Sequence, residues 1–294
     1  MRRKLNREEG GRMRGILIAA CILGLAGAYG YVSDIAFYIG HWNTDGWYDE
    51  SQFDDVELII KETGHLFREI KKFDDDHLEE FGKWAEANVD DGELDIIWLN
   101  GCMPSVLYPW PNKQPDGSLA ERWLEGGNMF INVGDWFAYV SYECDGARCQ
   151  ENGQMGAANI LDLGPGIITF GGNTQMKVTP TGKKYMPSLG DTCRTDRPVV
   201  LSEVKDPWEV AAIFASLGGS DDPAKESQAD PVVIHDTKTD GYLAIINQAV
   251  KANWVKRGPV CAEFIKNWVA GQGLITPVEP AGKLPVTWGA IKAR

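Results

Sequence analysis

The chain has 294 residues, of which 44% are hydrophobic, and its formal net charge at pH 7 is −13. This length and composition allow a full hydrophobic core, and they favour one α/β domain with insertions over two domains. Nucleic-acid phosphates need a basic footprint, and the acidic body of the chain offers none. We therefore expect no nucleic-acid partner.

The chain starts with a basic segment followed by an apolar one. Six Arg or Lys residues lie among residues 1–14, and residues 15–32 carry no charge. Together with the small residues Ala26 to Ala28, this is the pattern of a signal peptide cleaved near Ala28. The apolar run to Val32 is also just long enough for the ~20 residues of a membrane span. We expect an exported, periplasmic or extracellular protein, with an uncleaved N-terminal anchor as the alternative. A membrane partner is expected only in that second case.

Residues 94–139 organise the predicted fold. Two apolar runs, 95–99 and 128–133, flank an amphipathic segment at 118–125. A strand covered on both faces is continuously apolar, whereas its crossover helix is striped, so the unit reads as strand, helix, strand. Ser118 and Glu121 have the spacing of a capping box, and Gly126-Gly127 provides a stop.

The segments before this unit continue the alternation. Residues 34–40 form an apolar, β-rich run that we take as the first, central strand. A helix starting at residues 51–54, an edge strand within 66–73 and a helix capped by Asp76 follow it. The order predicts a flavodoxin-like α/β fold, with a parallel sheet and helices on both faces.

The pattern changes after Trp136. Residues 141–230 show short strand candidates (166–170, 176–179, 199–204 and 208–216) without a long helical period, which predicts a β-rich insertion. Two β-rich runs around Asp240-Gly241 then predict a closing hairpin, at 232–235 and 242–247. A last helix is expected from Gly258-Pro259 to Gly271, and residues 276–294 read as an extended tail.

Cysteine spacing gives little chemistry. Cys144 and Cys149 enclose an Asp-Gly turn and could form a disulfide after export, or could remain two thiols in a surface loop. The chain has no Cys-x-x-Cys and no His-Glu-x-x-His, so no strong zinc motif is present. No cofactor is implied.

The segments 95–101, 124–136 and 241–249 resemble the class I glutamine amidotransferase-like fold, including its ThuA-like relatives. In that resemblance the first segment is the strand ending in a glycine turn, and the second is the helix end, double glycine and strand leading to the nucleophile elbow. The third is the closing strand, where amidotransferases carry His-Pro-Glu.

The resemblance does not extend to the catalytic triad. A thiolate nucleophile needs a cysteine at the elbow and a histidine with a glutamate behind it. Here the elbow has Gly134, and the closing strand ends in Asn247-Gln248. Cys102 follows a different strand, and we read it as an inert buried or disulfide-bonded cysteine. We therefore expect no glutaminase activity.

Loops after the central strands are the expected ligand site, because open α/β sheets bind ligands beyond the carboxyl ends of their strands. Aromatic rings beside amides and carboxylates suit a carbohydrate or another polyol. The candidates in these loops are His41, Trp42, Asn43, Asp45, Trp47, Asn100, Cys102, Tyr108, Trp110, Asp135 and Trp136.

These candidates leave alternatives open. His41, Asp45 and Asp135 could be catalytic or bind a metal, but His41 could equally be an ordinary loop residue and Asp135 a helix cap. The tryptophans could belong to the core. Three hypotheses follow: a non-catalytic ligand-binding or assembly domain, a ThuA-like hydrolase acting on a sugar, and a membrane-anchored structural partner.

Overall fold

The computed structural model describes residues 33–40, 54–141, 151–247 and 256–275 of the chain. The predicted signal peptide, the Cys144–Cys149 pair and the C-terminal tail lie outside these residues. Within the described residues no helix is both long and apolar enough to cross a membrane.

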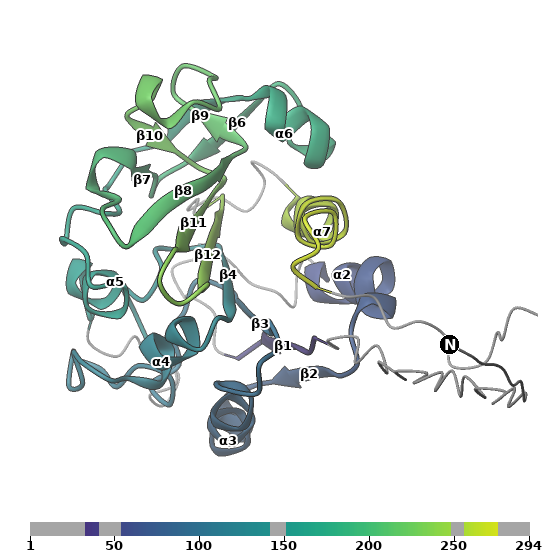
Figure 1. Cartoon of the computed structure of the whole chain (residues 1–294), viewed down its shortest axis with the longest axis vertical. Helices are drawn as coiled ribbons and strands as arrows, with labels where there is room; N and C mark the ends of the chain where they lie inside the picture. Colours follow the sequence, from purple (N-terminus) through teal and green to yellow (C-terminus); the bar gives the residue numbers. More distant parts are fainter. Residues whose placement is uncertain (1–32, 41–53, 142–150, 248–255, 276–294) are drawn as a thin grey trace, which may run out of the picture.

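A seven-stranded sheet forms the centre of the described part (Figure 1). Its order is β2-β1-β3-β4-β12-β11-β8; the first five strands are parallel, and β11 is antiparallel to both of its neighbours. This confirms the flavodoxin-like prediction. The first strand is not central as predicted, because β1 lies next to the edge strand β2 and β4 takes the middle position. The bounds are β1 Ile35–Tyr38, β2 Ile70–Phe73, β3 Ile96–Leu99, β4 Met129–Val133, β8 Trp208–Ile213, β11 Val232–Asp236 and β12 Tyr242–Ile246.

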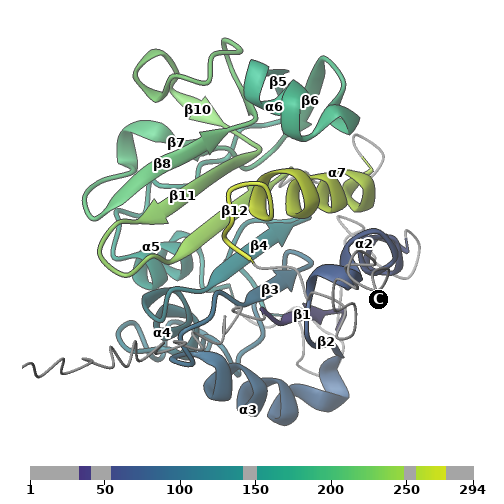
Figure 2. The same cartoon turned by 45° about the vertical axis from the view of Figure 1, so that its right-hand side comes forward.

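Helices cover both faces of this sheet (Figures 1 and 2). On one face lie α2 (Asp55–Thr63) and α7 (Arg257–Glu263), which continues as a π-helix over Phe264–Val269. On the other face lie α3 (Leu78–Asn88), α4 (Leu119–Glu125) and α5 (Gln154–Leu161). Each face buries its own apolar cluster, so the sheet is the middle of three layers.

Local sequence signals account for α4. Ser118 Oγ accepts a hydrogen bond from the Glu121 backbone N–H at 3.2 Å, and the Glu121 carboxylate accepts one from the Gly117 N–H. The helix ends at Gly126, where an added Cβ would lie 1.8 Å from the Val89 carbonyl oxygen. The predicted Ser118 cap and the stop are both confirmed, while the Glu121 carboxylate binds the N–H before the cap residue instead of that of Ser118 itself.

The cap predicted for α3 was wrong. Asp74, not Asp76, caps the chain there, accepting from the Asp76 N–H at 3.1 Å. It starts a 3₁₀ turn over Asp75–His77 that leads into α3. The other 3₁₀ turns cover Gly64–Leu66, Pro187–Leu189, Leu201–Glu203 and Pro223–Lys225.

The β-rich region between β4 and β11 contains a second, smaller sheet, drawn at the top of Figure 1. Its order is β6-β5-β9-β10-β7, with bounds β5 Thr174–Val178, β6 Thr192–Thr195, β7 Val199–Val200, β9 Ala215–Ser216 and β10 Gln228–Ala229. The sequence did not predict β6, the helix α5 or the short helix α6 (Pro180–Tyr185). The predicted strand 208–216 is divided between the two sheets, as β8 and β9.

The closing elements match their prediction. β11 and β12 form an antiparallel hairpin, and β12 lies parallel to β4. α7 carries Pro259 in its first turn, and it buries Cys261 together with the π-helical residues Phe264, Ile265, Trp268 and Val269. The hairpin therefore brings the start of α7 to the same sheet edge as the end of β4.

Candidate functional site

The carboxyl ends of the central strands line up at one edge of the sheet. Tyr38 pairs with Leu99 and Leu99 with Asn132, while Ile246 pairs with Val133. The residues that follow these strands, Asn100, Gly134 and Asn247, therefore occupy neighbouring positions. This is the edge at which open α/β sheets bind ligands.

Two glycines shape the centre of this edge. Gly134, the elbow position, has a φ of +84°, and Gly101 has a φ of +94°. A Cβ added to Gly101 would lie 2.3 Å from the Asp135 backbone nitrogen, so the turn after β3 packs against the elbow. The elbow keeps the left-handed backbone of a sharp strand exit, but Gly134 has no side chain to act as a nucleophile.

Asp135 does not cap a helix, contrary to one interpretation of the sequence. The chain after β4 makes a turn, and Val140 forms an isolated β-bridge with Glu151. The Asp135 Oδ1 instead accepts from the Trp136 N–H at 2.7 Å. Its backbone carbonyl accepts from the Asn132 side-chain amide at 2.8 Å, which closes the elbow on itself.

A buried ion pair occupies the elbow. Arg197 Nε lies 3.7 Å from Asp135 Oδ1, and the two side chains are only 7% and 4% exposed. The Arg197 guanidinium lies over the rings of Trp136 and Phe170, at 5.5 and 4.6 Å from their centroids. Since Arg197 comes from the segment between β6 and β7, the β-rich region contributes directly to this edge.

The end of β12 carries a polar network rather than an acid–base pair. The Asn247 backbone N–H donates to Asp230 Oδ1 at 2.6 Å. The Asn247 carbonyl accepts from Nε and Nη2 of the fully buried Arg257, at 3.3 Å each. An amide side chain cannot take a proton from a nucleophile at neutral pH, so this position offers no general base.

Cys193 on β6 lies beside this network. Its thiol donates to the Asp230 carbonyl at 3.6 Å, and the side chain is buried. Burial, with a smaller contribution from the Asp230 charge, raises the pKa of Cys193 to about 12. The thiol is therefore protonated at neutral pH, and the reactive thiolate form is absent.

The other predicted site residues within the described part are mainly core residues. The Asn100 side chain donates to the Gly40 carbonyl at 3.4 Å and accepts from the N–H of the buried Cys102 at 3.3 Å. The Tyr108 hydroxyl bonds Asn112 and Asn159, and the Trp136 ring is buried. The Lys113 Nζ lies over the ring of the half-buried Trp110, 5.4 Å from its centroid.

The remaining predicted site residues lie outside the described part: His41, Trp42, Asn43, Asp45, Trp47, Cys144, Cys149 and Gln248. The sugar-site hypothesis therefore stays a prediction. In the ranges that the structure describes, no group of three or more His, Cys, Asp or Glu side chains is arranged to hold a metal.

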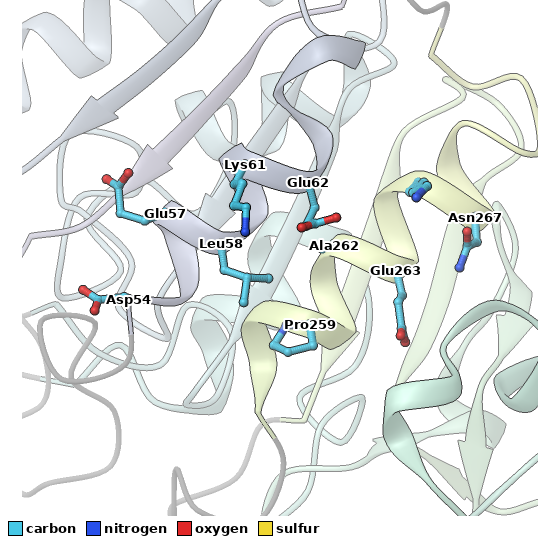
Figure 3. Close-up of a pocket in the computed structure, with 10 residues that line it drawn as sticks. Asp54, Glu57, Leu58, Lys61, Glu62, Pro259, Ala262, Glu263 and Asn267 are labelled. Atoms are coloured by element: carbon cyan, nitrogen blue, oxygen red, sulfur yellow. The ribbon is translucent and has the colours of Figure 1, made fainter.

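An open groove lies between α2 and α7 and encloses about 690 Å³ (Figure 3). Leu58, Pro259 and Ala262 supply its apolar surface. Its charged and polar lining consists of Asp54, Glu57, Lys61, Glu62, Glu263, Lys266 and Asn267.

Two contacts fix the geometry of this groove. Asp55 Oδ1 accepts from the Gly258 N–H at 2.8 Å, and a Cβ on Gly258 would lie 2.6 Å from that oxygen, so the two helix starts approach closely. Both oxygens of Glu263 accept from Ser188, at 2.7 and 2.8 Å. These contacts hold α2 and α7 in position and so define the shape of the groove.

Sequence reasoning missed four residues of this edge, namely Cys193, Arg197, Asp230 and Arg257. They lie on the second sheet, in its connections and at the start of α7, and no local motif marks them. Only the tertiary arrangement brings them to the carboxyl edge.

No family model matches the chain, and no curated protein matches it. Among solved structures, it is similar to the glutaminase domain of Trypanosoma brucei CTP synthase with bound acivicin. The sequence identity is 12% and the TM-score 0.35, over 82% of this chain and 94% of that one. The relation is one of coarse fold.

Proposed function

We propose that the chain is an exported, non-catalytic domain of glutamine amidotransferase-like layout, which binds a small polar ligand or a protein partner. The Asp135–Arg197 pair carries this proposal. An activated cysteine would need a cationic or basic neighbour at the elbow. Here the elbow carries a carboxylate, and the cation beside it, Arg197, is paired with that carboxylate and lies over the rings of Trp136 and Phe170.

The nearby thiol supports the same proposal. Cys193 has its pKa raised to about 12, and the end of β12 presents Asn247. Neither group can supply the nucleophile or the base of an acyl transfer at neutral pH. We expect no ammonia release from glutamine, and measurable glutamine hydrolysis by the purified chain would contradict the proposal.

We place the binding surface in the α2–α7 groove. Its volume lies within the roughly 300–1,000 Å³ of small-molecule sites, and it combines an apolar surface with a few polar groups. By contrast, the polar groups described at the carboxyl edge are buried and engaged with each other.

A thermal-shift screen of the chain lacking residues 1–28 tests this placement. The additives are sugars, amino acids and divalent metals, with a chelator control. A ligand at a hundredfold excess over its Kd stabilises the native state by about 2.7 kcal/mol. We expect Glu62→Arg, in the groove, to abolish the shift. Glu80→Arg on the opposite face of the sheet is the matched control and should retain it.

The alternative is a ThuA-like hydrolase in which Asp135, which follows β4 at the carboxyl edge, acts with His41 and Asp45 on a sugar, with or without a metal. Under that alternative, a ligand shift would require a metal or be abolished by His41→Ala, and Glu62→Arg would leave it intact. The mass of the mature chain tests export, since an uncleaved anchor would retain residues 1–28.

A further inference from the structure

Four polar residues precede the four strands at the amino edge of the sheet, opposite the candidate site. Asp34 precedes β1, Arg68 lies just before β2, Asp95 precedes β3 and Asn128 precedes β4. They form a continuous chain of bonds. The Asp34 N–H donates to Asp95 Oδ1 at 2.5 Å, and the Asp95 N–H donates to the Asn128 side-chain oxygen at 2.8 Å.

The cation of this group, Arg68, binds other carboxylates and makes no hydrogen bond to Asp95. Arg68 binds the Asp34 carboxylate through Nε and Nη2, at 3.1 and 2.6 Å, and its Nη1 lies 3.2 Å from Glu93. Asp91 lies at 4.0 Å from the same guanidinium. The side-chain amide of Asn128 donates to the Asn88 and Val89 carbonyls at the end of α3.

Asp95 is the exception in this arrangement. The residue is completely buried, and its second carboxyl oxygen, Oδ2, has no hydrogen-bond partner. The charged groups that face it are Asp34 before β1, Arg68 before β2, and Asp91 and Glu93 on the turn before β3. Three of these four groups are acidic, so an ionised Asp95 would add a fourth negative charge, on a side chain that is itself shielded from water.

We propose that the buried Asp95 carboxyl is protonated in the folded protein at acidic pH and acts as a pH-sensitive latch between the starts of β1, β3 and β4. The neutral carboxyl still accepts from the Asp34 N–H, and it avoids the repulsion of its acidic neighbours. Loss of the proton leaves an uncompensated charge in the sheet edge, which weakens the fold. The latch is separate from the proposed binding groove, since none of its residues lines that groove.

The direction of the pH effect follows from burial. Burial first, and then the charges of Asp91, Asp34 and Glu93, raise the pKa of Asp95 to about 7 from an ordinary value of 3.8. The folded state therefore binds one more proton than the unfolded chain between these values. This group stabilises the fold fully below the unfolded pKa, and its contribution is lost as the pH rises to about 7.

The test is chemical unfolding between pH 5 and 9 of the chain lacking residues 1–28. Wild type and Asp95→Asn are compared. One extra bound proton makes the unfolding constant rise by up to about tenfold per pH unit, here between pH 5 and 7, and level off above. We expect Asp95→Asn to lose this rise. Asp116→Asn, which removes an exposed carboxylate, should keep the wild-type profile.

A direct measurement covers the case in which Asp95→Asn does not fold. The ¹³C carboxyl resonance of Asp95 in the wild-type chain reports its titration, and we expect a midpoint well above 5. Parallel unfolding profiles for wild type and Asp95→Asn would overturn the proposal. So would an Asp95 carboxyl that titrates near pH 4.

Discussion

The guanidinium of Arg197 and the carboxylate of Asp135 meet at 3.7 Å inside the protein, one from the β-rich region and one from the elbow after β4. Moving a charged group from water into the protein interior costs several kcal/mol, which the pairing and the surrounding contacts must offset. Here Asp135 also accepts from the Trp136 N–H, and the Trp136 and Phe170 rings flank the cation. The pair thus joins the second sheet to the centre of the first.

Replacing one member of this pair should lower the free energy of unfolding more than replacing both members. We expect Arg197→Met to lower the free energy of unfolding by about 3–5 kcal/mol, because Asp135 would remain buried without its cation. Adding Asp135→Asn should recover a large part of that loss. Urea unfolding of the two single variants and the double variant measures the coupling. Additive losses would show that the two charges do not interact.

The close approach of the β3 turn to the elbow predicts a second effect. Gly101→Ala places a Cβ 2.3 Å from the Asp135 nitrogen and also forces alanine into a φ of +94°. Gly92→Ala is a matched control, because its φ is +85° and a Cβ there meets no atom within 4 Å. The control should cost about 1–2 kcal/mol from backbone strain alone.

Gly101→Ala should lose clearly more, and its unfolding midpoint in urea should fall well below that of the control. Equal losses for the two variants would mean that the turn can move away from Asp135 without cost.

Sequence predicted the parts of this fold that depend on local patterns. The strands β1, β3 and β12 are continuously apolar and β4 is interrupted only by Asn132, and the Ser118–Glu121 box marks the start of α4, so both signals are readable without tertiary information. Helix α5 has no such signal. Its residues are apolar on most sides, so the sequence shows no amphipathic stripe. Its close packing, in which a Cβ on Gly156 would lie 2.0 Å from the Ala138 carbonyl oxygen, is a tertiary contact that the sequence does not reveal.

The candidate site was predictable only in position. The sequence placed Asn100, Gly134, Asp135 and Asn247 at the carboxyl edge because each follows a predicted strand. The partners of Asp135 and Asn247 could not be predicted, because Arg197, Asp230 and Arg257 reach the edge from other elements. Thr179 and Pro180, which start α6, were a readable start signal, but Thr179 was assigned to the end of a strand.

The state of Cys193 predicts low thiol reactivity. With a pKa of about 12, about one thiol in 10⁴ is ionised at pH 8, and burial further limits access. We expect iodoacetamide at pH 8 to leave Cys193 unmodified in the folded chain and to alkylate it in 6 M urea, as read from the mass of its peptide. Rapid alkylation in the folded chain would indicate an accessible thiolate and would reopen nucleophilic chemistry at this edge.

The contact between α2 and α7 predicts how the groove keeps its shape. Asp55 is buried, and its Oδ1 accepts from the Gly258 N–H, one of the N–H groups at the start of α7 that no helical carbonyl satisfies. Asp55→Ala leaves that donor without its partner, so we expect a loss of about 1 kcal/mol of stability or somewhat more. Glu57→Ala on the same helix removes only an exposed ion pair with Lys72 and should change stability by less than about 0.5 kcal/mol.

If the groove binds the ligand found in the thermal-shift screen, Asp55→Ala should also weaken that binding, as measured by calorimetry of the wild type and the variant. A ligand whose affinity is unchanged in Asp55→Ala and in Glu62→Arg must bind elsewhere on the protein.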